Sequence, residues 1–502
     1  MQPIYRTIQI RDIERRWFAA HPGVSLMERA GLAAAEQARD LLGDGYAVLV
    51  VCGPGNNGGD GLVAARELRH WGYRVTTVFL GERHKLPADA ALAHADLLAA
   101  GGVLDKSIPQ GGCWDLVIDA LFGIGLTRPI EGAMAKIVEQ VNALQTTVLA
   151  LDIPSGLDSD TGTARGAVVR ATQTLTFIAL KPGLLTSDAR DFCGEIRVAS
   201  LGIDAMLSLA PQGRLLDQQT VASYMHRRAA NSHKGSFGSV AVIGGAGGMV
   251  GACVLAARAA LKLGAGRVYG APLGGIPTGY DALQPELMWR KPQDLLRPEQ
   301  LTAVVIGPGM GRAPEARVGL SDVLEGSLPL IIDADALNLL AEHEPLQAAL
   351  AVRTGPTILT PHPGEAARLL GTSAAHVQGD RVAAATKLAV RFHCHVLLKG
   401  AGSICAAPDG RWFINPTGNP GMASAGMGDV LSGVIGALVG QGLAVEQALL
   451  LGVYLHGAAA DALVAEGIGP VGLTASDVTD RSRSLLNEWL YSPSALEHIN
   501  PQ

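Results

Sequence analysis

The sequence has few aromatic residues, few charged residues and no excess of charge of one sign. Aromatic residues make up 4% of the 502 residues and charged residues 17%, while 48% are hydrophobic. This composition excludes a disordered chain and a coiled coil. The net charge of −6 provides no electrostatic surface for nucleic acid or for an anionic membrane, so we expect neither as a partner.

Cysteine is also scarce, with six residues scattered along the chain and no CxxC pair. Their spacing matches neither a disulfide framework nor a zinc site. Residues 1–17 are charged and contain no apolar segment like that of a signal peptide. The longest uncharged run, between Lys234 and Arg258, contains seven glycines, which is typical of a strand, a loop and a helix rather than a membrane span. We therefore expect a cytoplasmic protein.

Glycine, in contrast, is abundant at 63 residues and suits an α/β protein with many tight turns. Segments of helical spacing alternate with apolar, β-branched runs at residues 46–52, 74–80, 115–120, 146–153 and 173–179. Such near-continuous apolar strands predict a parallel sheet covered by helices on both faces.

A second series of predicted strands begins at residue 239, and residues 403–406 and 412–414 predict a hairpin. The chain is also too long for one compact domain. Length and pattern together predict an α/β protein of two three-layer αβα domains, residues 1–215 and residues 220–502.

Three loops follow predicted strands of the first domain and carry polar side chains. The first, GPGNNGGDG at residues 53–61, precedes a helix predicted over residues 62–71. Its glycines allow a ligand to approach closely, and free amides at a helix start favour an anion such as phosphate. Asp119 and Asp152 each end a further apolar run, and either one alone is better explained by a turn or a helix cap. Because ligands bind at the carboxyl ends of parallel strands, the three loops together predict one crevice.

The motifs GPGNNGGDG, DALFGIGLTRP and LDIPSGLDSDTG, in this order, resemble the N-terminal domain of the bacterial bifunctional NAD(P)H-hydrate repair enzymes. Over residues 1–215 the resemblance implies a Rossmann-like epimerase of NADHX and NADPHX, the hydrated forms of NADH and NADPH, with a bound potassium ion. It implies dinucleotide binding by Asn56, Asn57, Gly58, Gly59, Asp60, Gly123, Ile124, Gly125, Leu126, Thr127, Arg128, Pro129 and Asp152. The implied potassium ligands are Asn57, Asp119 and Ser155, and oxygen ligands suit a hard cation.

The segment GNPGMASAGMGD, residues 418–429, precedes a helix predicted over residues 430–439. The small residues at 425–428 would present backbone amides at the helix N-terminus, which suits a phosphoryl group in transfer. Asp429 beside them is placed to act as a general base for a hydroxyl. An acid that only favours the helix dipole would explain Asp429 but not the small residues before it.

This arrangement resembles the ribokinase-like superfamily. The motifs HKGSFG, GPGMG, DADALN, TPHPGE, KGAGS and NPGMASAGMGDVLSG together resemble the ADP/ATP-dependent NAD(P)H-hydrate dehydratases, the other half of the same repair enzymes, over residues 225–495. The resemblance implies substrate contacts from Ala252, Gly309, His362 and Asp429. It implies adenine-nucleotide contacts from Lys399, Gly400, Ala401, Gly402, Ser403 and Gly428.

The resemblance also implies the chemistry. In the hydrated dinucleotide the hydroxyl lies on a carbon next to the ring nitrogen, so epimerisation needs only modest help with proton transfer, about 10²–10⁴-fold per group. Asp152 is the candidate for that role, and Lys181 is a weaker one, because an exposed lysine at a strand end is usually just solvated. Dehydration needs a better leaving group, which phosphorylation of the hydroxyl provides, with magnesium bridging the nucleotide phosphates. We expect ADP as the donor, as in bacterial family members, although the residues also allow ATP.

Two other functions stay open at this point. The C-terminal motifs alone also fit a plain small-molecule kinase, which would accumulate a stable phosphorylated product. The N-terminal domain could be a binding module without activity, although such a module has little need of Asp60, Asp119 and Asp152 beside a phosphate loop. The residues leave the oligomeric state open, and a homo-oligomer is our expectation.

Overall fold

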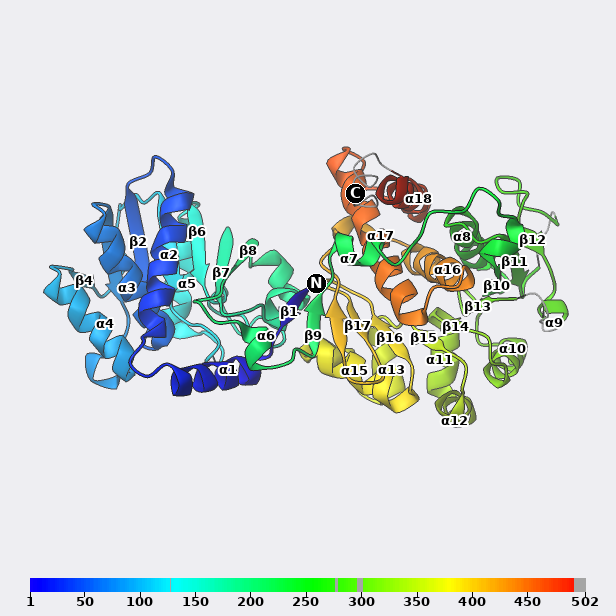
Figure 1. Ribbon diagram of the computed structural model, residues 1–502, viewed down its shortest axis with the longest axis horizontal. Helices are drawn as coiled ribbons and strands as arrows, with labels where there is room; N and C mark the ends of the chain where they lie inside the picture. The colour runs from blue at the N-terminus through cyan, green and yellow to red at the C-terminus, as the bar shows by residue number, and fades with distance from the viewer. Residues whose placement is uncertain (127, 276–278, 296–300, 492–502) are drawn as a thin grey trace. The chain divides into compact units, whose positions relative to one another are not determined.

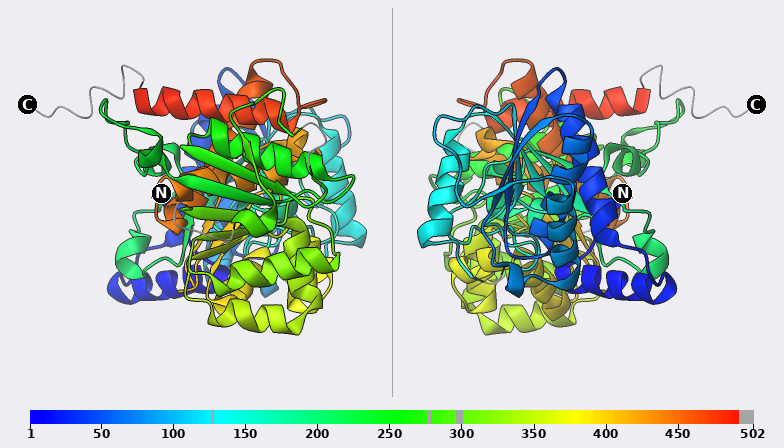
Figure 2. Two further views of the ribbon diagram at one scale, coloured as in Figure 1. Left: turned by 90° about the vertical axis from the view of Figure 1, so that its right-hand side faces the viewer. Right: turned by 90° about the vertical axis from the view of Figure 1, so that its left-hand side faces the viewer.

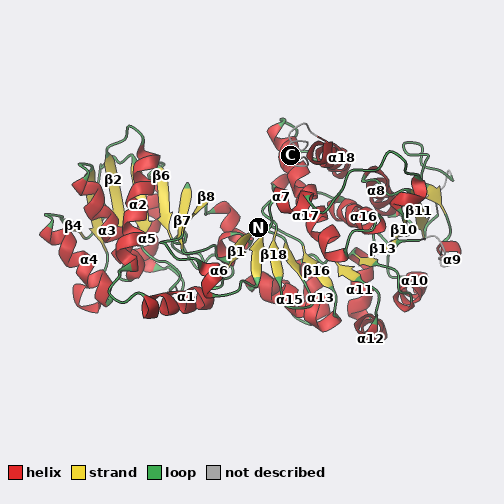
Figure 3. Cartoon of the chain, viewed as in Figure 1, coloured by secondary structure: helices red, strands yellow, loops and turns green. Residues whose placement is uncertain are grey.

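The computed structural model describes residues 1–126, 128–275, 279–295 and 301–491 (Figure 1). The chain forms two compact units, Gln2–Gly213 and Arg214–Gln502. In each unit helices pack around strands that are mostly parallel, which confirms the predicted α/β class (Figure 3).

The N-terminal unit is built on a parallel sheet with the strand order β4-β3-β2-β5-β6-β7-β8. The strands are β2 (Ala47–Cys52), β3 (Arg74–Phe79), β4 (Leu104–Asp105), β5 (Leu116–Ala120), β6 (Thr147–Leu151), β7 (Gln173–Phe177) and β8 (Glu195–Ala199). A short strand β1 (Gln2–Ile4) makes a parallel bridge from Ile4 to Leu180. Val51 of β2 pairs with Asp119, which pairs in turn with Ala150 of β6, so three strands end at one edge of the sheet.

Helices pack on both faces of this sheet. They are α1 (Thr7–Ala20), α2 (Leu26–Leu42), α3 (Asn56–His70), α4 (Ala88–Ala99), α5 (Gly132–Ala143) and α6 (Ala205–Ser208), with short 3₁₀ helices η1 (Arg83–Lys85), η2 (Pro182–Leu184) and η3 (Ser187–Asp191). The side chains of β2 alternate between two cores, because successive side chains of a strand point to opposite faces. Val48 and Val50 pack with α2 and α3, whereas Leu49 and Val51 pack with α5. This is the predicted three-layer arrangement.

The C-terminal unit has a sheet with the strand order β9-β18-β17-β16-β15-β14-β13-β10-β11-β12. The strands are β9 (Gly213–Leu215), β10 (Ser239–Gly244), β11 (Arg267–Pro272), β12 (Met288–Trp289), β13 (Ala303–Ile306), β14 (Leu330–Ile332), β15 (Thr357–Leu359), β16 (His395–Leu398), β17 (Ile404–Ala406) and β18 (Trp412–Ile414). Strands β10 to β16 pair in parallel. Strands β17 and β18 pair antiparallel, which confirms the predicted hairpin.

The helices of this unit also lie on both faces of its sheet. They are α7 (Gln218–Ala222), α8 (Val250–Lys262), α9 (Pro292–Leu295), α10 (Pro314–Glu325), α11 (Ala334–Glu342), α12 (Glu344–Val352), α13 (Pro363–Leu370), α14 (Ala374–Gly379), α15 (Arg381–Phe392), α16 (Met427–Gly440), α17 (Val445–Ala465) and α18 (Ala475–Tyr491), with η4 (Lys234–Phe237) and η5 (Pro420–Met422). In the left view of Figure 2 the green strands lie between the red helix α18 and the yellow-green helices α10 to α12. One core joins Val240 and Val242 of β10 to α8, α16 and α17.

Helix α17 is the one helix among the described residues with the length and apolar composition to cross a membrane. Its most apolar stretch is 67% buried within the unit. Leu451 and Leu455, for example, are fully buried in the core that α17 shares with α8 and α16. Its apolar side chains are therefore accounted for by packing inside the C-terminal unit.

Candidate active sites

Helix α3 begins at Asn56, inside the glycine-rich segment, so the prediction of a loop up to residue 61 is wrong. A Cβ on Gly58 would lie 2.0 Å from the carbonyl oxygen of Gly53, and a Cβ on Gly61 would lie 2.5 Å from the Cβ of Ala120. The helix can therefore start directly against the ends of β2 and β5 only because these positions have no side chain. Because glycine has a poor helix propensity, the sequence pattern did not predict the first turns of this helix.

Asp119 and Ser155, two of the predicted potassium ligands, are bonded to each other. The carboxylate of Asp119 accepts hydrogen bonds from the Ser155 hydroxyl at 2.7 Å and from its backbone N–H at 2.8 Å. The Ser155 hydroxyl oxygen also accepts from the backbone N–H of Phe122 at 2.9 Å. Burial raises the pKa of Asp119 to about 6, although the hydrogen bonds from Ser155 oppose the rise. An ionised Asp119 is therefore costly here unless a further positive charge lies near it.

Asn57, the third predicted potassium ligand, is 8% exposed. Its side-chain oxygen and nitrogen are both buried and make no hydrogen bond with any described residue. Leaving such a group unsatisfied costs about 1–3 kcal/mol. A Cβ on Gly123 would lie 3.2 Å from Asn57 Cγ and 3.2 Å from Asp152 Oδ2, so these three residues meet at one point. Asn57 is therefore the described residue that points most directly to a bound ligand.

Asp152 follows β6 and has a positive φ of 65°, which is uncommon for a residue with a side chain. Its carboxylate oxygen Oδ1 lies 2.5 Å from the ammonium of Lys181. The other oxygen, Oδ2, accepts a long hydrogen bond of 3.4 Å from the backbone N–H of Ile124. Lys181 is 1% exposed, so our expectation of a solvated strand-end lysine is wrong. The chain bends at Ile178 and Ala179, directly after β7, and Lys181 follows these bends as a buried residue.

Two more carboxyl groups face Asp152. Burial raises the pKa of Asp60 well above its ordinary value, and the charges of Asp152, Glu14 and Asp89 raise it further. Burial and the charge of Asp152 likewise raise the pKa of Glu14, against the opposing charges of Lys181 and Arg11. Glu14 lies on α1, and sequence reasoning missed it because the helix gives no motif. At neutral pH the site thus favours a proton on Asp60 more strongly than an exposed aspartate would.

The loop after β5 supplies the remaining predicted residues. Gly123, Ile124 and Leu126 are partly buried, whereas Gly125, Arg128 and Pro129 are exposed. The predicted Thr127 lies outside the described residues. The backbone N–H of Leu126 donates to the carbonyl oxygen of Gly123 at 3.3 Å, so the loop turns back over the end of its strand.

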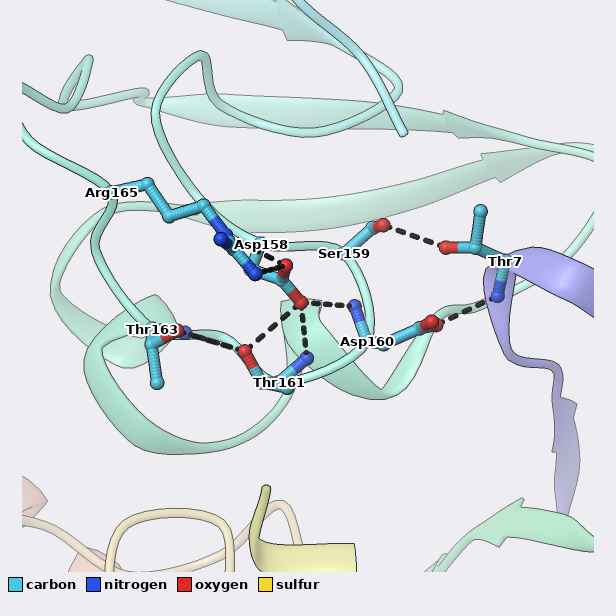
Figure 4. Close-up of polar contacts among 7 residues, drawn as sticks. All are labelled: Thr7, Asp158, Ser159, Asp160, Thr161, Thr163 and Arg165. Atoms are coloured by element: carbon cyan, nitrogen blue, oxygen red, sulfur yellow. Dashed lines mark hydrogen bonds and ion pairs between the residues drawn. The ribbon is translucent and has the colours of Figure 1, made fainter. Parts of the chain in front are cut away.

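Hydrogen bonds around Asp158 hold the segment that follows β6 (Figure 4). Arg165 donates to Asp158 Oδ2 at 2.8 Å, and the backbone N–H of Asp160 donates to Asp158 Oδ1 at 3.0 Å. Asp160 in turn accepts a hydrogen bond of 2.7 Å from the backbone N–H of Thr7, the first residue of α1. The segment therefore fixes the start of the helix that carries Glu14.

In the C-terminal unit, Asp429 lies in the first turn of α16, which begins at Met427 rather than at residue 430 as predicted. Gly426 before it has a φ of 87°, a conformation that favours glycine. Burial and the carboxylate of Asp333 raise the pKa of Asp429 to about 6, against the opposing charge of Lys399. Asp429 is thus mostly ionised at neutral pH and is a stronger base than an exposed aspartate.

Lys399 follows β16, and its ammonium group reaches the first turn of α16. Its ammonium donates to Asp333 Oδ1 at 2.8 Å, and a Cβ on Gly428 would lie 3.2 Å from its Nζ. Burial lowers the pKa of Lys399, but the carboxylates of Asp333 and Glu365 outweigh burial and raise it. The structure therefore brings together Lys399, Gly428 and Asp429 from the predicted set.

The loop of Lys399, Gly400, Ala401, Gly402 and Ser403 lies over a buried arginine that sequence reasoning missed. Arg381 is 1% exposed and donates to the carbonyl oxygens of Leu398 at 3.3 Å and Lys399 at 3.2 Å. Burial lowers its pKa to about 10, so it stays charged at neutral pH. Gly400 has a φ of 139°, and a Cβ there would lie 2.8 Å from the guanidinium. The guanidinium thus binds the backbone carbonyl oxygens at the start of the loop, those of Leu398 and Lys399.

Ala252 and Gly309, two predicted substrate contacts, are neighbours. A Cβ on Gly309 would lie 2.9 Å from that of Ala252 on α8. His362 instead caps α13, where its Nδ1 accepts from the backbone N–H of Gly364 at 2.9 Å. Its Nε2 lies 3.2 Å from Glu365 Oε1. This cap explains the flanking sequence PHPGE without a ligand, and it leaves the half-exposed ring accessible.

Other polar residues near Asp429 were not among the predicted site residues. Asp333 and Asp335 belong to the motif DADALN, and Asp335 accepts from the backbone N–H of Gly311 at 2.8 Å. His456 on α17 is buried, and burial together with the charge of Lys399 lowers its pKa to about 4. Its Nε2 makes no hydrogen bond with any described residue. His456 looks like a core residue of an apolar helix in the sequence, and only the fold brings it close to Lys399.

Within the described parts of the chain, no three His, Cys, Asp or Glu side chains gather in a way that could hold a metal ion. The oxygen set predicted for potassium includes an amide and a hydroxyl and is a different kind of site.

Two family models match this chain. Residues 240–482 match the model described as NAD(P)H-hydrate dehydratase, and residues 23–183 match the one described as YjeF-related protein N-terminus. The first includes Asp429 and Lys399, and the second includes Asn57 and Asp152. Each match therefore covers one of the two clusters of polar residues.

Similar proteins share both parts. The bifunctional NAD(P)H-hydrate repair enzyme Nnr of Coxiella burnetii is 41% identical over 498 residues, covering 97% of this chain and 100% of that protein. The enzyme of the same name from Escherichia coli is 41% identical and covers 92% of this chain and 89% of that protein. A solved ADP/ATP-dependent NAD(P)H-hydrate dehydratase of Bacillus subtilis, co-crystallized with ATP/Mg2+, is 29% identical with a TM-score of 0.48, covering 55% of this chain and 98% of that one. Because identity extends over nearly the whole length of both repair enzymes, the resemblance seen in the motifs is confirmed, and the chain belongs to the bifunctional NAD(P)H-hydrate repair enzymes.

Proposed function

We propose that this protein repairs hydrated NADH and NADPH in two steps, one in each unit. Residues 1–215 interconvert the R and S epimers of NADHX and NADPHX. Residues 220–502 dehydrate the S epimer with ADP as phosphoryl donor, and ATP is the alternative donor. The observation that carries the proposal is the identity to bifunctional repair enzymes over 97% of the chain. A separate cluster of partly or fully buried acids in each unit supports it.

In the epimerase unit we assign the dinucleotide to the start of α3 and to the loop after β5. Backbone amides at a helix start suit its phosphate groups. We assign Asp152 as the base that takes the proton of the substrate hydroxyl. The bond between that carbon and the ring nitrogen then breaks, which leaves an aldehyde and a nitrogen that takes up a proton. Closure on the opposite face of the carbonyl, with the protons returned, gives the other epimer.

Potassium fits the residues that the motifs assign to it. Both polar atoms of the Asn57 side chain are buried without a hydrogen bond to any described residue, and burial raises the pKa of Asp119 to about 6. A cation would satisfy the amide oxygen and stabilise the carboxylate. Asn57, Asp119 and Ser155 would hold the ion, and the ion would supply a fixed positive charge next to the bound dinucleotide.

In the dehydratase unit we assign Asp429 as the base that takes the hydroxyl proton while the hydroxyl oxygen attacks the terminal phosphorus of the nucleotide. The amides at the start of α16 stabilise charge on the phosphoryl group. Lys399, held by Asp333 at 2.8 Å, places a positive charge beside it. The phosphorylated carbon then loses phosphate as the ring nitrogen donates its lone pair, and loss of a proton from the neighbouring carbon restores the double bond of the reduced nicotinamide.

The loop after β16 and Gly428 are assigned to the nucleotide, and Ala252, Gly309 and His362 to the hydrated dinucleotide. Since no three His, Cys, Asp or Glu side chains among the described residues are arranged to hold a metal ion, magnesium would be held mainly by nucleotide phosphates and water. It would neutralise phosphate charge during transfer.

We place the reaction in the cytoplasm, which suits six free cysteines, since cytoplasmic thiols stay reduced. We also expect copies of the chain to associate into a homo-oligomer. Light scattering of the purified protein tests this expectation, and a monomer mass at micromolar concentration would contradict it.

The test of the proposed function is to incubate the protein with purified S-NADHX, magnesium and ADP. We expect the absorbance of the dihydronicotinamide to rise while one phosphate is released per dinucleotide. A stable phosphorylated dinucleotide without this absorbance would indicate a plain kinase. No reaction of either kind, with ADP or ATP, would contradict the assignment of the C-terminal unit.

A further inference from the structure

Lys181 makes all the hydrogen bonds that its ammonium group can donate. Its Nζ lies 2.5 Å from Asp152 Oδ1, 2.8 Å from the Thr176 hydroxyl and 2.9 Å from the Phe177 carbonyl oxygen. An ammonium has three N–H donors and no acceptor. The side chain is also 1% exposed, so neither water nor a substrate reaches it. Lys181 therefore has no proton to share with the hydrated dinucleotide.

The same contacts leave the two oxygens of Asp152 unequal. Oδ1 is the oxygen that Lys181 binds, and the Thr176 hydroxyl and the Phe177 backbone N–H also lie 3.4 Å from it. Oδ2 receives one long hydrogen bond, from the Ile124 backbone at 3.4 Å, and faces the backbone of Gly123. Only Oδ2 is left for a new hydrogen-bond partner. Asp152 also has a positive φ, so without its side-chain contacts little would favour this orientation.

We propose that Lys181 is a positioning residue of the epimerase, which binds one oxygen of Asp152 and thereby keeps the other oxygen directed at the substrate hydroxyl. This inference rests on the proposed function of the N-terminal unit. It assigns the proton transfer to Asp152 alone and gives Lys181 no contact with substrate.

The surroundings of Asp152 explain why a lysine is needed. Glu14 from α1 and Asp60 from α3 face the carboxylate, and both are acids. Arg11 is also near, but it acts on Glu14. Without the ammonium, Asp152 would share a partly buried site with two other carboxyl groups, which favours its protonated form. A protonated Asp152 cannot act as a base.

The first test replaces the ammonium, with Lys181→Met, in the full chain. Exchange of purified R-NADHX into the S epimer is followed by chromatography without nucleotide, so that no dehydration occurs, and the spontaneous rate is subtracted. At pH 7 we expect kcat to fall by about 10²-fold, the lower range for one proton-transfer group, with a smaller change in KM. The acidic limb of the rate profile should move to higher pH, so that part of the rate returns as the pH is raised.

The matched control is Arg165→Met, which removes another ion pair of the same unit, 2.5 Å from Asp158, without touching Asp152. We expect the pH profile of this variant to keep its wild-type shape. An equal shift in both variants would mean that any loss of an ion pair in this region has the same effect, and it would overturn the role of Lys181.

The second test is a double-mutant cycle with Asp152→Asn. If Lys181 acts only through Asp152, the variant with both substitutions should be no slower than Asp152→Asn alone. A further loss of tenfold or more would show a separate role for the lysine and refute the proposal. The doubly substituted site leaves neither Lys181 nor Asp152 as an unpaired buried charge, so its exchange rate can be measured even if Lys181→Met alone does not fold.

The outcomes separate this inference from the function on which it rests. If the unmodified protein does not accelerate exchange of the epimers, the proposed function of the N-terminal unit fails. If it does, and Lys181→Met keeps both the full rate and the wild-type pH profile, only the role of Lys181 is wrong.

Discussion

Replacing Asp429 by asparagine should remove the catalytic base of the dehydratase, while the size and shape of the side chain stay almost the same. Because burial and Asp333 raise the pKa of Asp429 to about 6, about nine-tenths of the carboxyl groups are ionised at pH 7. The wild-type rate at pH 7 is then close to its maximum. A positioned base contributes about 10²–10⁴-fold, so the rate with purified S-NADHX and ADP should fall by that factor, or about 3–5 kcal/mol of barrier.

The same prediction also gives an expected change in the ratio of the wild-type and variant rates between pH 7 and pH 5. At pH 5 only about a tenth of Asp429 is ionised, so the wild-type rate should have fallen about tenfold. The asparagine variant has no group to titrate at this position, and the ratio of the two rates should therefore shrink about tenfold between pH 7 and pH 5. The assay is the initial rise in dihydronicotinamide absorbance, with released phosphate measured in parallel.

The control for Asp429→Asn lies in the same chain. Exchange of R- and S-NADHX without nucleotide should stay within twofold of wild type, because the N-terminal unit has its own site. Two results would refute the reasoning: a variant that keeps more than a third of the dehydration rate, or a rate ratio that does not change between pH 5 and pH 7.

Two further predictions concern the potassium site and the nucleotide loop. Because burial raises the pKa of Asp119 to about 6, its ionisation costs stability as the pH rises from about 4 through 6. Potassium, compared with tetramethylammonium, should therefore raise the melting temperature of the N-terminal unit more at pH 8 than at pH 5, and Asp119→Asn should remove that difference. An equal effect of both cations would contradict a potassium site at Asp119. Arg381→Met removes the guanidinium that donates to the carbonyl oxygens of Leu398 and Lys399. The KM for ADP should therefore rise about tenfold or more, while the rate of epimer exchange stays unchanged. A wild-type KM for ADP in a folded variant would show that the guanidinium does not position the loop.

The predictable part of the fold came from continuous apolar strands. All six residues of β2 are buried, and the run AVLVVC marks a strand that is covered on both faces. The hairpin of β17 and β18 was equally clear, because two short apolar runs flank Pro408, Asp409 and Gly410. Such signals are local, so they survive in the sequence.

The starts of α3 and α16 were not predictable in the same way. Both helices begin within glycine-rich segments, and at Gly58 the reason is the close approach of the Gly53 carbonyl, a contact between separate elements. Helical periodicity depends on apolar side chains, and glycine has none. Short-range patterns therefore placed these helix starts too late, although they marked the correct loops.

The polar residues of the two sites also fall into two groups, those that a sequence motif identifies and those that only the fold brings to the site. Asp429 and Asp152 stand in motifs and could be named from the sequence. Lys181 was ranked low because exposure cannot be read from one residue type, and its burial depends on how the chain turns after β7. Arg381 and His456 lie on amphipathic or apolar helices far from any motif, and only the packed structure brings them to the loop that follows β16.

The most direct measurement of the two-step repair uses an equal mixture of R- and S-NADHX with ADP and the Asp152→Asn variant. In-line phosphoryl transfer requires the hydroxyl within reach of Asp429, and a misplacement of about 1 Å can cost about 10²-fold, so only the S epimer should react. Wild-type protein should convert the whole mixture in one phase. The variant should convert the S half rapidly and the remainder at the spontaneous rate of epimerisation. Conversion of both halves by the variant in a single fast phase would contradict the division of labour between the two units.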